Sequence, residues 1–309
     1  MGYFYGPVPS RRLGISLGAD LIPLKTCSFD CLYCQLGRGG KKTATRRFYA
    51  DLEKFKEELK TILKRNKTID YITISGSGEP TLHKDLDKII KTIKKTSKNN
   101  YPVCVITNSS LLYRKAVRQE LKEADLIIPS LDAATPTVFR KINRPHESIS
   151  FAKVIKGLIA LRKEYKGKIW LEIMFVGGVN DSLSQAEKFK SIIKKIKPDK
   201  VQLNTPIRPA GVKISLPKEK RLEKIKDILS EDAEVIVTFA PQRKAFKDSR
   251  NLEKKILRFL EVRPATLQDF SNSLGLNSNV IIKCVDSLLE KKSIKKRLYK
   301  GKIYFTRYD

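Results

Sequence analysis

Hydrophobic residues follow two alternating patterns through the first 240 positions of this 309-residue chain. Short runs rich in β-branched residues predict buried strands, and longer stretches with apolar residues three and four positions apart predict amphipathic helices. The predicted strands are 14–22, 70–76, 102–107, 125–131, 168–176 and 199–205, with a further candidate at 234–239. The predicted helices are 52–63, 86–93, 111–123, 149–165, 184–196 and 217–229.

About six repeats of strand and helix predict an α/β fold with parallel strands joined by crossover helices. We expect a partial (β/α)6 TIM-like barrel over residues 1–240. An open, doubly wound sheet is the alternative, because the alternation alone is compatible with both.

The pattern changes near residue 240, where 241–250 lack clear periodicity and are expected to form a linker. Residues 251–309 then show three helical segments followed by two short strands around a Lys-Gly tip. This order resembles a small C-terminal winged helix-turn-helix domain, which we expect to span 251–309.

Lys and Arg outnumber Asp and Glu by 63 to 33, giving a net charge of +30, which favours a polyanionic partner, nucleic acid first. The alternative is a Lys-rich solvated surface, since 251–309, with 13 basic and 6 acidic residues, is only slightly richer in charge than the rest. No apolar run reaches the ~20 residues of a membrane helix, and the first residues lack the apolar stretch of a signal peptide. A cytoplasmic protein without membrane contact is the expectation.

Three of the five cysteines, Cys27, Cys31 and Cys34, share the stretch CSFDCLYC. In a reducing compartment, such cysteines bind metal or do chemistry more often than they form disulfides. Structural zinc needs four ligands, and no fourth is evident here. A cubane iron–sulfur cluster has four irons, so three thiolates leave one iron open. Cys104 and Cys284 occupy apolar positions typical of buried structural cysteines.

The C-x3-C-x2-C spacing, with Tyr33 before the last cysteine and a predicted strand before the loop, resembles the signature of the radical SAM (S-adenosylmethionine) superfamily. The resemblance implies that the three cysteines bind one 4Fe-4S cluster and that the amine and carboxylate of S-adenosylmethionine chelate the open iron. It places Tyr33 near the adenine; the alternative is an aromatic side chain that packs the loop.

The second predicted strand ends in SGSGEPTL, where Ser77, Gly78 and Glu79 resemble the family's Gly-Gly-Glu-Pro motif with Ser77 replacing the first glycine. The resemblance implies that this segment contacts the amine of S-adenosylmethionine. Asn108 and Ser130 follow the next two strands and suit the ribose hydroxyls and methionine carboxylate. Ligand chemistry collects at the carboxyl ends of parallel barrel strands. The alternatives are a polar turn for the first motif and loop caps for Asn108 and Ser130.

The resemblance implies an enzyme whose reduced cluster cleaves S-adenosylmethionine to a 5′-deoxyadenosyl radical that abstracts hydrogen from a substrate, with an external low-potential electron donor. The opening GPVPSRRLGISLG resembles a mostly uncharacterised subgroup near the wyosine-type tRNA-modifying enzymes, which favours RNA as substrate. Those enzymes carry additional N-terminal cysteines, and none precedes Cys27 here, which argues against the same reaction. The alternatives are an activase or small-molecule enzyme with a protein-docking winged domain, and a non-enzymatic metal-sensing regulator.

The predicted winged domain has two interpretations: it contacts RNA or DNA, or it binds a partner protein or packs on the barrel. Its expected reading helix begins NSNV and lacks Arg or Lys for guanine edges, so specific DNA readout is not expected. Six arginines are candidates to meet phosphate or a substrate carboxylate, with solvated or salt-bridged roles as the alternative. They are Arg11, Arg12, Arg46, Arg47, Arg140 and Arg144.

Overall fold

An eight-stranded sheet forms the body of the protein in a computed structural model that describes residues 2–65, 68–236 and 251–308. The strands lie in chain order: β1 (Phe4–Ser10), β2 (Gly14–Ala19), β3 (Tyr71–Ile74), β4 (Val103–Thr107), β5 (Leu126–Pro129), β6 (Lys168–Met174), β7 (Lys200–Asn204) and β8 (Ala233–Val235). Strand β1 runs antiparallel to β2, and all later neighbours are parallel. Within the described ranges no pairing joins β8 to β1, so the sheet is a partial barrel.

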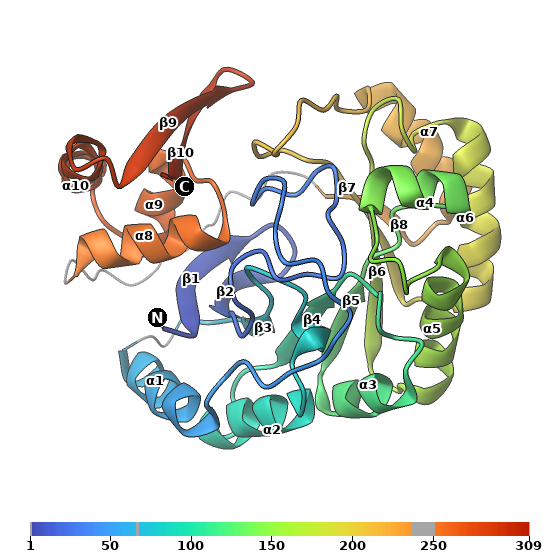
Figure 1. Cartoon of the computed structure of the whole chain (residues 1–309), viewed down its shortest axis with the longest axis horizontal. Helices are drawn as coiled ribbons and strands as arrows, with labels where there is room; N and C mark the ends of the chain where they lie inside the picture. The colour runs from blue at the N-terminus through green and yellow to red at the C-terminus, as the bar shows by residue number, and fades with distance from the viewer. Residues whose placement is uncertain (1, 66–67, 237–250, 309) are drawn as a thin grey trace.

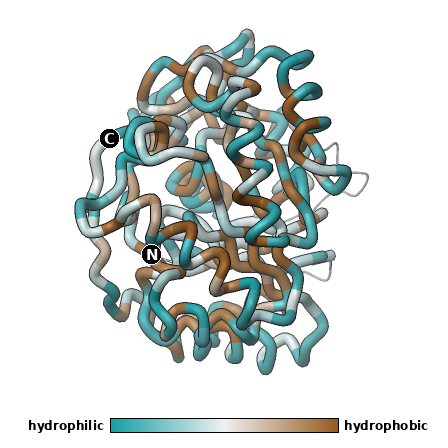
Figure 2. Tube along the Cα trace, turned by 90° about the vertical axis from the view of Figure 1, so that its right-hand side faces the viewer, coloured by the Kyte–Doolittle hydropathy of each residue, from teal (hydrophilic) through white to brown (hydrophobic). Residues whose placement is uncertain are grey.

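Helices cover the outer face of this sheet (Figure 1). They are α1 (Leu52–Arg65), α2 (Leu86–Thr96), α3 (Lys115–Glu120), α4 (Pro136–Asn143), α5 (Phe151–Glu164), α6 (Leu183–Ile196) and α7 (Glu219–Leu229). Because the strand order never reverses, successive right-handed crossovers place the helices on one side. The α/β barrel is therefore confirmed, and the doubly wound alternative is wrong. The hydropathy trace shows brown, apolar stretches inside and teal, polar stretches outside (Figure 2).

One β-strand and one α-helix were not expected from the sequence. Strand β1 carries Pro7 and Pro9, which a central strand excludes but which an edge strand tolerates. Helix α4 begins after Thr135, whose side chain caps the Val138 N–H, and has Pro136 at its first position. The expected strand 234–239 corresponds to β8 (Ala233–Val235). Residues 237–239 and the expected linker 241–250 lie outside the described residues.

The C-terminal part contains α8 (Leu252–Val262), α9 (Leu267–Leu274) and α10 (Ser278–Glu290), followed by an antiparallel hairpin of β9 (Ile294–Tyr299) and β10 (Lys302–Arg307). Its apolar core includes Phe259, Phe270 and Val285, and Val8 of β1 is buried in the same cluster. The C-terminal part therefore packs on the edge strand of the barrel. In the described ranges, no helix is long and apolar enough to cross a membrane.

Candidate active site

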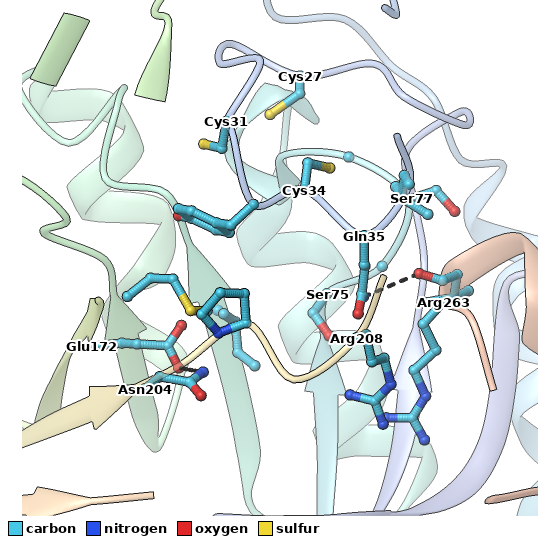
Figure 3. A pocket seen from close by; sticks show the side chains of 18 of the residues that line it. Cys27, Cys31, Cys34, Gln35, Ser75, Ser77, Glu172, Asn204, Arg208 and Arg263 are labelled. Atoms are coloured by element: carbon cyan, nitrogen blue, oxygen red, sulfur yellow. Dashed lines mark hydrogen bonds between the residues drawn. The ribbon is translucent and has the colours of Figure 1, made fainter. Parts of the chain in front are cut away.

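The loop after β2 carries Cys27, Cys31 and Cys34, which lie close together and line one cavity (Figure 3). Backbone bonds fix the loop to the end of α4, since the Leu32 N–H donates to the Ile142 carbonyl at 2.8 Å. The Cys27 N–H donates to the Lys41 carbonyl at 3.1 Å, which folds the return of the loop against its start. These backbone hydrogen bonds fix the conformation of the loop that carries the three thiols.

Each thiol is packed among protein atoms, and burial raises its pKa: to about 12 for Cys27, well above the usual value for Cys31, and upward for Cys34. Two amides donate to the sulfurs, Asn108 Nδ2 to Cys27 Sγ at 3.4 Å and Asn143 Nδ2 to Cys31 Sγ at 3.5 Å. Such donors stabilise thiolates once a metal displaces their protons.

The described residues contain no group of three or more Cys, His, Asp or Glu side chains arranged to hold a single metal ion. The three cysteines are free, and soft thiolates on one loop are the donors that an iron–sulfur cluster takes at its corners. The donor set therefore fits a cluster.

The loop after β3 lies directly against the start of the cysteine loop. The Lys25 N–H donates to the Ser77 carbonyl at 2.8 Å, and the Ser77 hydroxyl donates to Asp20 at 2.6 Å. A Cβ on Gly78 would lie 2.1 Å from the Thr26 carbonyl oxygen, so only glycine fits here. The Gly-Glu-Pro part of the motif thus sets the spacing between the two loops.

Glu79 is buried, and its carboxylate joins the ends of β3 and β4. It accepts hydrogen bonds from the hydroxyls of Thr81 and Thr107, both at 2.6 Å, and from the Asn108 N–H at 2.7 Å. Burial raises the pKa of Glu79, and these bonds oppose that shift. The Glu79 carboxylate therefore accepts its hydrogen bonds from protein groups, and its bond to the Asn108 N–H orients Asn108 toward Cys27.

Asp132, just past β5, is a second buried carboxylate beside the cysteine loop. It accepts a very short hydrogen bond from the Tyr33 hydroxyl and one from Asn143 Nδ2 at 2.7 Å. The sequence analysis did not predict Asp132 and Asn143 as site residues. Thr135 and Pro136 are typical of a helix start, and a helix predicted from them would have included Asn143. Ser130 lies nearby, and its carbonyl accepts a hydrogen bond from the Ser109 hydroxyl at 2.7 Å.

A cavity of about 410 Å³ opens beside the three cysteines. Tyr33, Ser77 and Gly78 line it, whereas Glu79, Asn108 and Ser130 lie outside the lining that the described residues form. Four arginines also line it: Arg11, Arg12, Arg208 and Arg263.

The other candidate arginines lie outside this cavity. Arg46 pairs with Glu120, and an Arg144 nitrogen lies 3.7 Å from Asp30. Arg47 and Arg140 are exposed to solvent. Only Arg11 and Arg12 of the six predicted arginines therefore reach the cavity.

Residues 21–189 match the family model described as "Radical SAM superfamily". This chain belongs to the radical SAM superfamily. It is 36% identical over 307 residues to a UPF0026 protein of Methanocaldococcus jannaschii, covering 97% of this chain and 94% of that protein. A protein of Brachyspira hyodysenteriae named GTPase Obg is 39% identical over 301 residues, covering 96% of this chain but 44% of that protein.

A solved radical SAM methyltransferase from Sphaerobacter thermophilus has a TM-score of 0.53 with this structure. It is 15% identical and covers 75% of this chain and 68% of that one, so the likeness shows the fold alone. Membership in the superfamily makes this protein a radical SAM iron–sulfur enzyme with a 4Fe-4S cluster and S-adenosylmethionine as cofactors. Enzymes of this superfamily need a reductant, and Cys27, Cys31 and Cys34 fit cluster binding.

Proposed function

We propose that Cys27, Cys31 and Cys34 each bind one iron of the cluster and leave the fourth iron to S-adenosylmethionine. The observation that carries this proposal is that three cysteines of one loop at the carboxyl end of the sheet lie close together and line one cavity (Figure 3). Tyr33, Ser77 and Gly78 line that cavity and contact the cofactor directly in this proposal. Glu79, Asn108 and Ser130 complete the cofactor site from behind this wall.

A cluster and S-adenosylmethionine held at this site would supply radical chemistry for removing a hydrogen atom from the substrate. The chain's own part is to orient these groups and to exclude water. The amides of Asn108 and Asn143 donate to two of the three sulfurs. Asp132 fixes the Tyr33 ring through its hydroxyl, so the aromatic face keeps one orientation toward the cavity.

We propose RNA as the substrate and residues 251–309 as a winged-helix domain that contacts it. The net charge of +30 supports a polyanionic partner. The β9–β10 hairpin supports it locally, because Lys296, Lys300 and Lys302 are exposed there. Lysines on a hairpin wing commonly contact phosphates without reading sequence.

A small-molecule substrate is the second candidate, because the same hairpin packs on the barrel. Arg297 donates to the Ala210 carbonyl at 2.8 Å, and Tyr304 donates to the Ile207 carbonyl at 3.1 Å. In Figure 1 the segment after β7 reaches toward this hairpin. The C-terminal part then serves to close the cavity around a compact substrate.

Salt-dependent RNA binding separates the two candidates. For an RNA enzyme, the logarithm of affinity should fall linearly with the logarithm of salt concentration. Changing Lys296, Lys300 and Lys302 together to Gln should reduce the slope by about 2, since each phosphate contact contributes about 0.7 for single strands.

The matched control changes three exposed lysines of α6, Lys188, Lys194 and Lys195, to Gln, with the same loss of charge. If the hairpin and α6 variants have equal slopes, RNA contact through the hairpin is wrong. If the wild type binds no RNA, the small-molecule candidate stands instead.

A further inference from the structure

The cavity beside the cysteines is also lined by three arginines from distant parts of the chain. Arg11 follows β1, Arg208 follows β7, and Arg263 follows α8. Figure 3 shows the ends of Arg208 and Arg263 side by side. Three like charges have therefore been brought to one cavity by folding.

These guanidinium groups lack a matching set of acidic partners. Arg208 pairs with Asp269, whose Oδ1 lies 3.8 Å from Arg208 Nη2, and the Asp269 carboxylate also accepts hydrogen bonds from Thr266 in the capping box of α9. Among the described residues, Arg208 Nε and both Nε and Nη2 of Arg263 are buried without a hydrogen-bond partner. Arg11 forms no ion pair within the same described ranges.

The electrostatic consequence is mutual repulsion among the three guanidinium groups. Burial and the charge of Arg208 lower the pKa of Arg263 to about 9 and that of Arg11 to about 10. Arg12 differs from these three, because it pairs with Glu172. Buried N–H groups without partners destabilise a fold, so such a cluster persists where a ligand completes it.

We propose that Arg11, Arg208 and Arg263 form an anion subsite that holds a phosphate group of the substrate, with the C-terminal part supplying Arg263. Guanidinium forks match phosphate oxygens in pairs. Three cations facing one acid leave an excess of positive charge, which suits phosphate better than a single carboxylate. This inference rests on the proposed function only in taking the cavity beside the cysteines as the substrate cavity.

The position of Arg263 also gives the C-terminal part a role in the site. Val262 lines the same cavity, and its carbonyl accepts a hydrogen bond from Gln35 Nε2, on the cysteine loop side, at 3.3 Å. Arg263 stacks over Phe259, with its guanidinium carbon 4.6 Å from the ring centroid. The α8–α9 connection is thus fixed against the cysteine loop and to its own core.

The test is calorimetric binding of inorganic pyrophosphate to the reconstituted holoenzyme. We expect saturable binding that weakens about 10-fold to 100-fold in Arg208→Gln and in Arg263→Gln, since hydrogen bonds to charged groups are the strong ones. Arg140→Gln, an exposed arginine on α4, is the control and should bind as the wild type does. Equal affinity in all four proteins would overturn the proposal.

Three further readouts keep the test decisive. Arg263→Lys keeps the charge but loses the fork, so it should bind between the wild type and Arg263→Gln, and it replaces the Gln variant if that fails to fold. If the arginine variants lose S-adenosylmethionine binding but keep pyrophosphate binding, the subsite belongs to the cofactor and the proposal is wrong. Competition by a 5′-mononucleotide, or only by an RNA oligonucleotide, identifies the source of the phosphate and supports the subsite in either case.

The two proposals fail separately. A wild-type holoenzyme that binds pyrophosphate but leaves S-adenosylmethionine intact contradicts the proposed function and leaves the subsite standing. One that cleaves S-adenosylmethionine but does not bind pyrophosphate contradicts the subsite alone.

Discussion

Gly78 controls how closely the β3 loop approaches the cysteine loop. The atoms around an added Cβ are the Thr26 carbonyl oxygen at 2.1 Å and Ile22 Cγ2 at 2.4 Å, so backbone as well as side chain would have to move. The constraint is steric and local. It acts on Thr26, which directly precedes Cys27 in the chain.

Replacing Gly78 with Ala should therefore lower the free energy of unfolding by about 3 kcal/mol and reduce cluster content, because overpacking displaces the loop. Thermal denaturation and iron analysis measure the two effects. Gly39→Ala is the control: its Cβ meets nothing within 4 Å, and its φ of +72° should cost only about 1 kcal/mol. Equal losses in the two variants would show that close approach is not what requires glycine at position 78.

At the scale of elements, hydrogen bonds join the segment 46–49 to the end of the short 3-10 helix η1 (Pro80–Leu82). The Arg47 N–H donates to the Leu82 carbonyl at 3.0 Å, and the Tyr49 N–H donates to His83 Nδ1 at 3.1 Å. Burial and then the charge of Arg46 lower the pKa of His83 from 6.5 to about 4. The neutral ring is thus the form that the fold requires.

Acid should loosen this contact. Because the pKa is lower folded than unfolded, the unfolded state binds more protons as pH falls from 6.5 toward 4, and stability drops over that window. The loss attributable to His83 is up to about 3 kcal/mol. Urea unfolding of the wild type and His83→Asn, which keeps an acceptor without titrating, checks this. Parallel pH profiles for the two proteins would contradict it.

Apart from α4, the barrel elements from β2 through α7 were predictable, because apolar spacing alone specifies them. Strand β1 was not, since its prolines argue against a strand until the edge position is known. The three cysteines and the SGSGEP motif are contiguous in the sequence and could be found there. Asp132 and Asn143 join them only through the packing of α4, and Arg11, Arg208 and Arg263 converge only after the chain is folded.

At the scale of the whole molecule, Val8 belongs to an edge strand of the barrel and to the core of the C-terminal part. Arg258 of α8 reaches Asp20 at 3.3 Å, and Asp20 accepts the Ser77 hydroxyl. The C-terminal part is therefore joined to the cofactor side of the barrel by an apolar and a polar contact.

Calorimetry of wild type should show one unfolding transition, and Val8→Asp should split it into two. A buried carboxylate without a partner costs several kcal/mol, which should release the C-terminal part first. Val280→Asp is the matched control, since Val280 is 43% exposed on α10 and the same change there should leave one transition. A single transition in Val8→Asp would show that this shared core does not couple the two parts.

The most direct test of this assignment is anaerobic reconstitution with iron and sulfide, followed by reduction with dithionite in the presence of S-adenosylmethionine and assay for 5′-deoxyadenosine. We predict about four irons per chain and reductant-dependent product in the wild type and in Cys284→Ala, with both lost in Cys31→Ala. A protein that holds a single zinc and leaves S-adenosylmethionine intact, or a Cys31→Ala variant that retains cluster and product, would contradict the central claim.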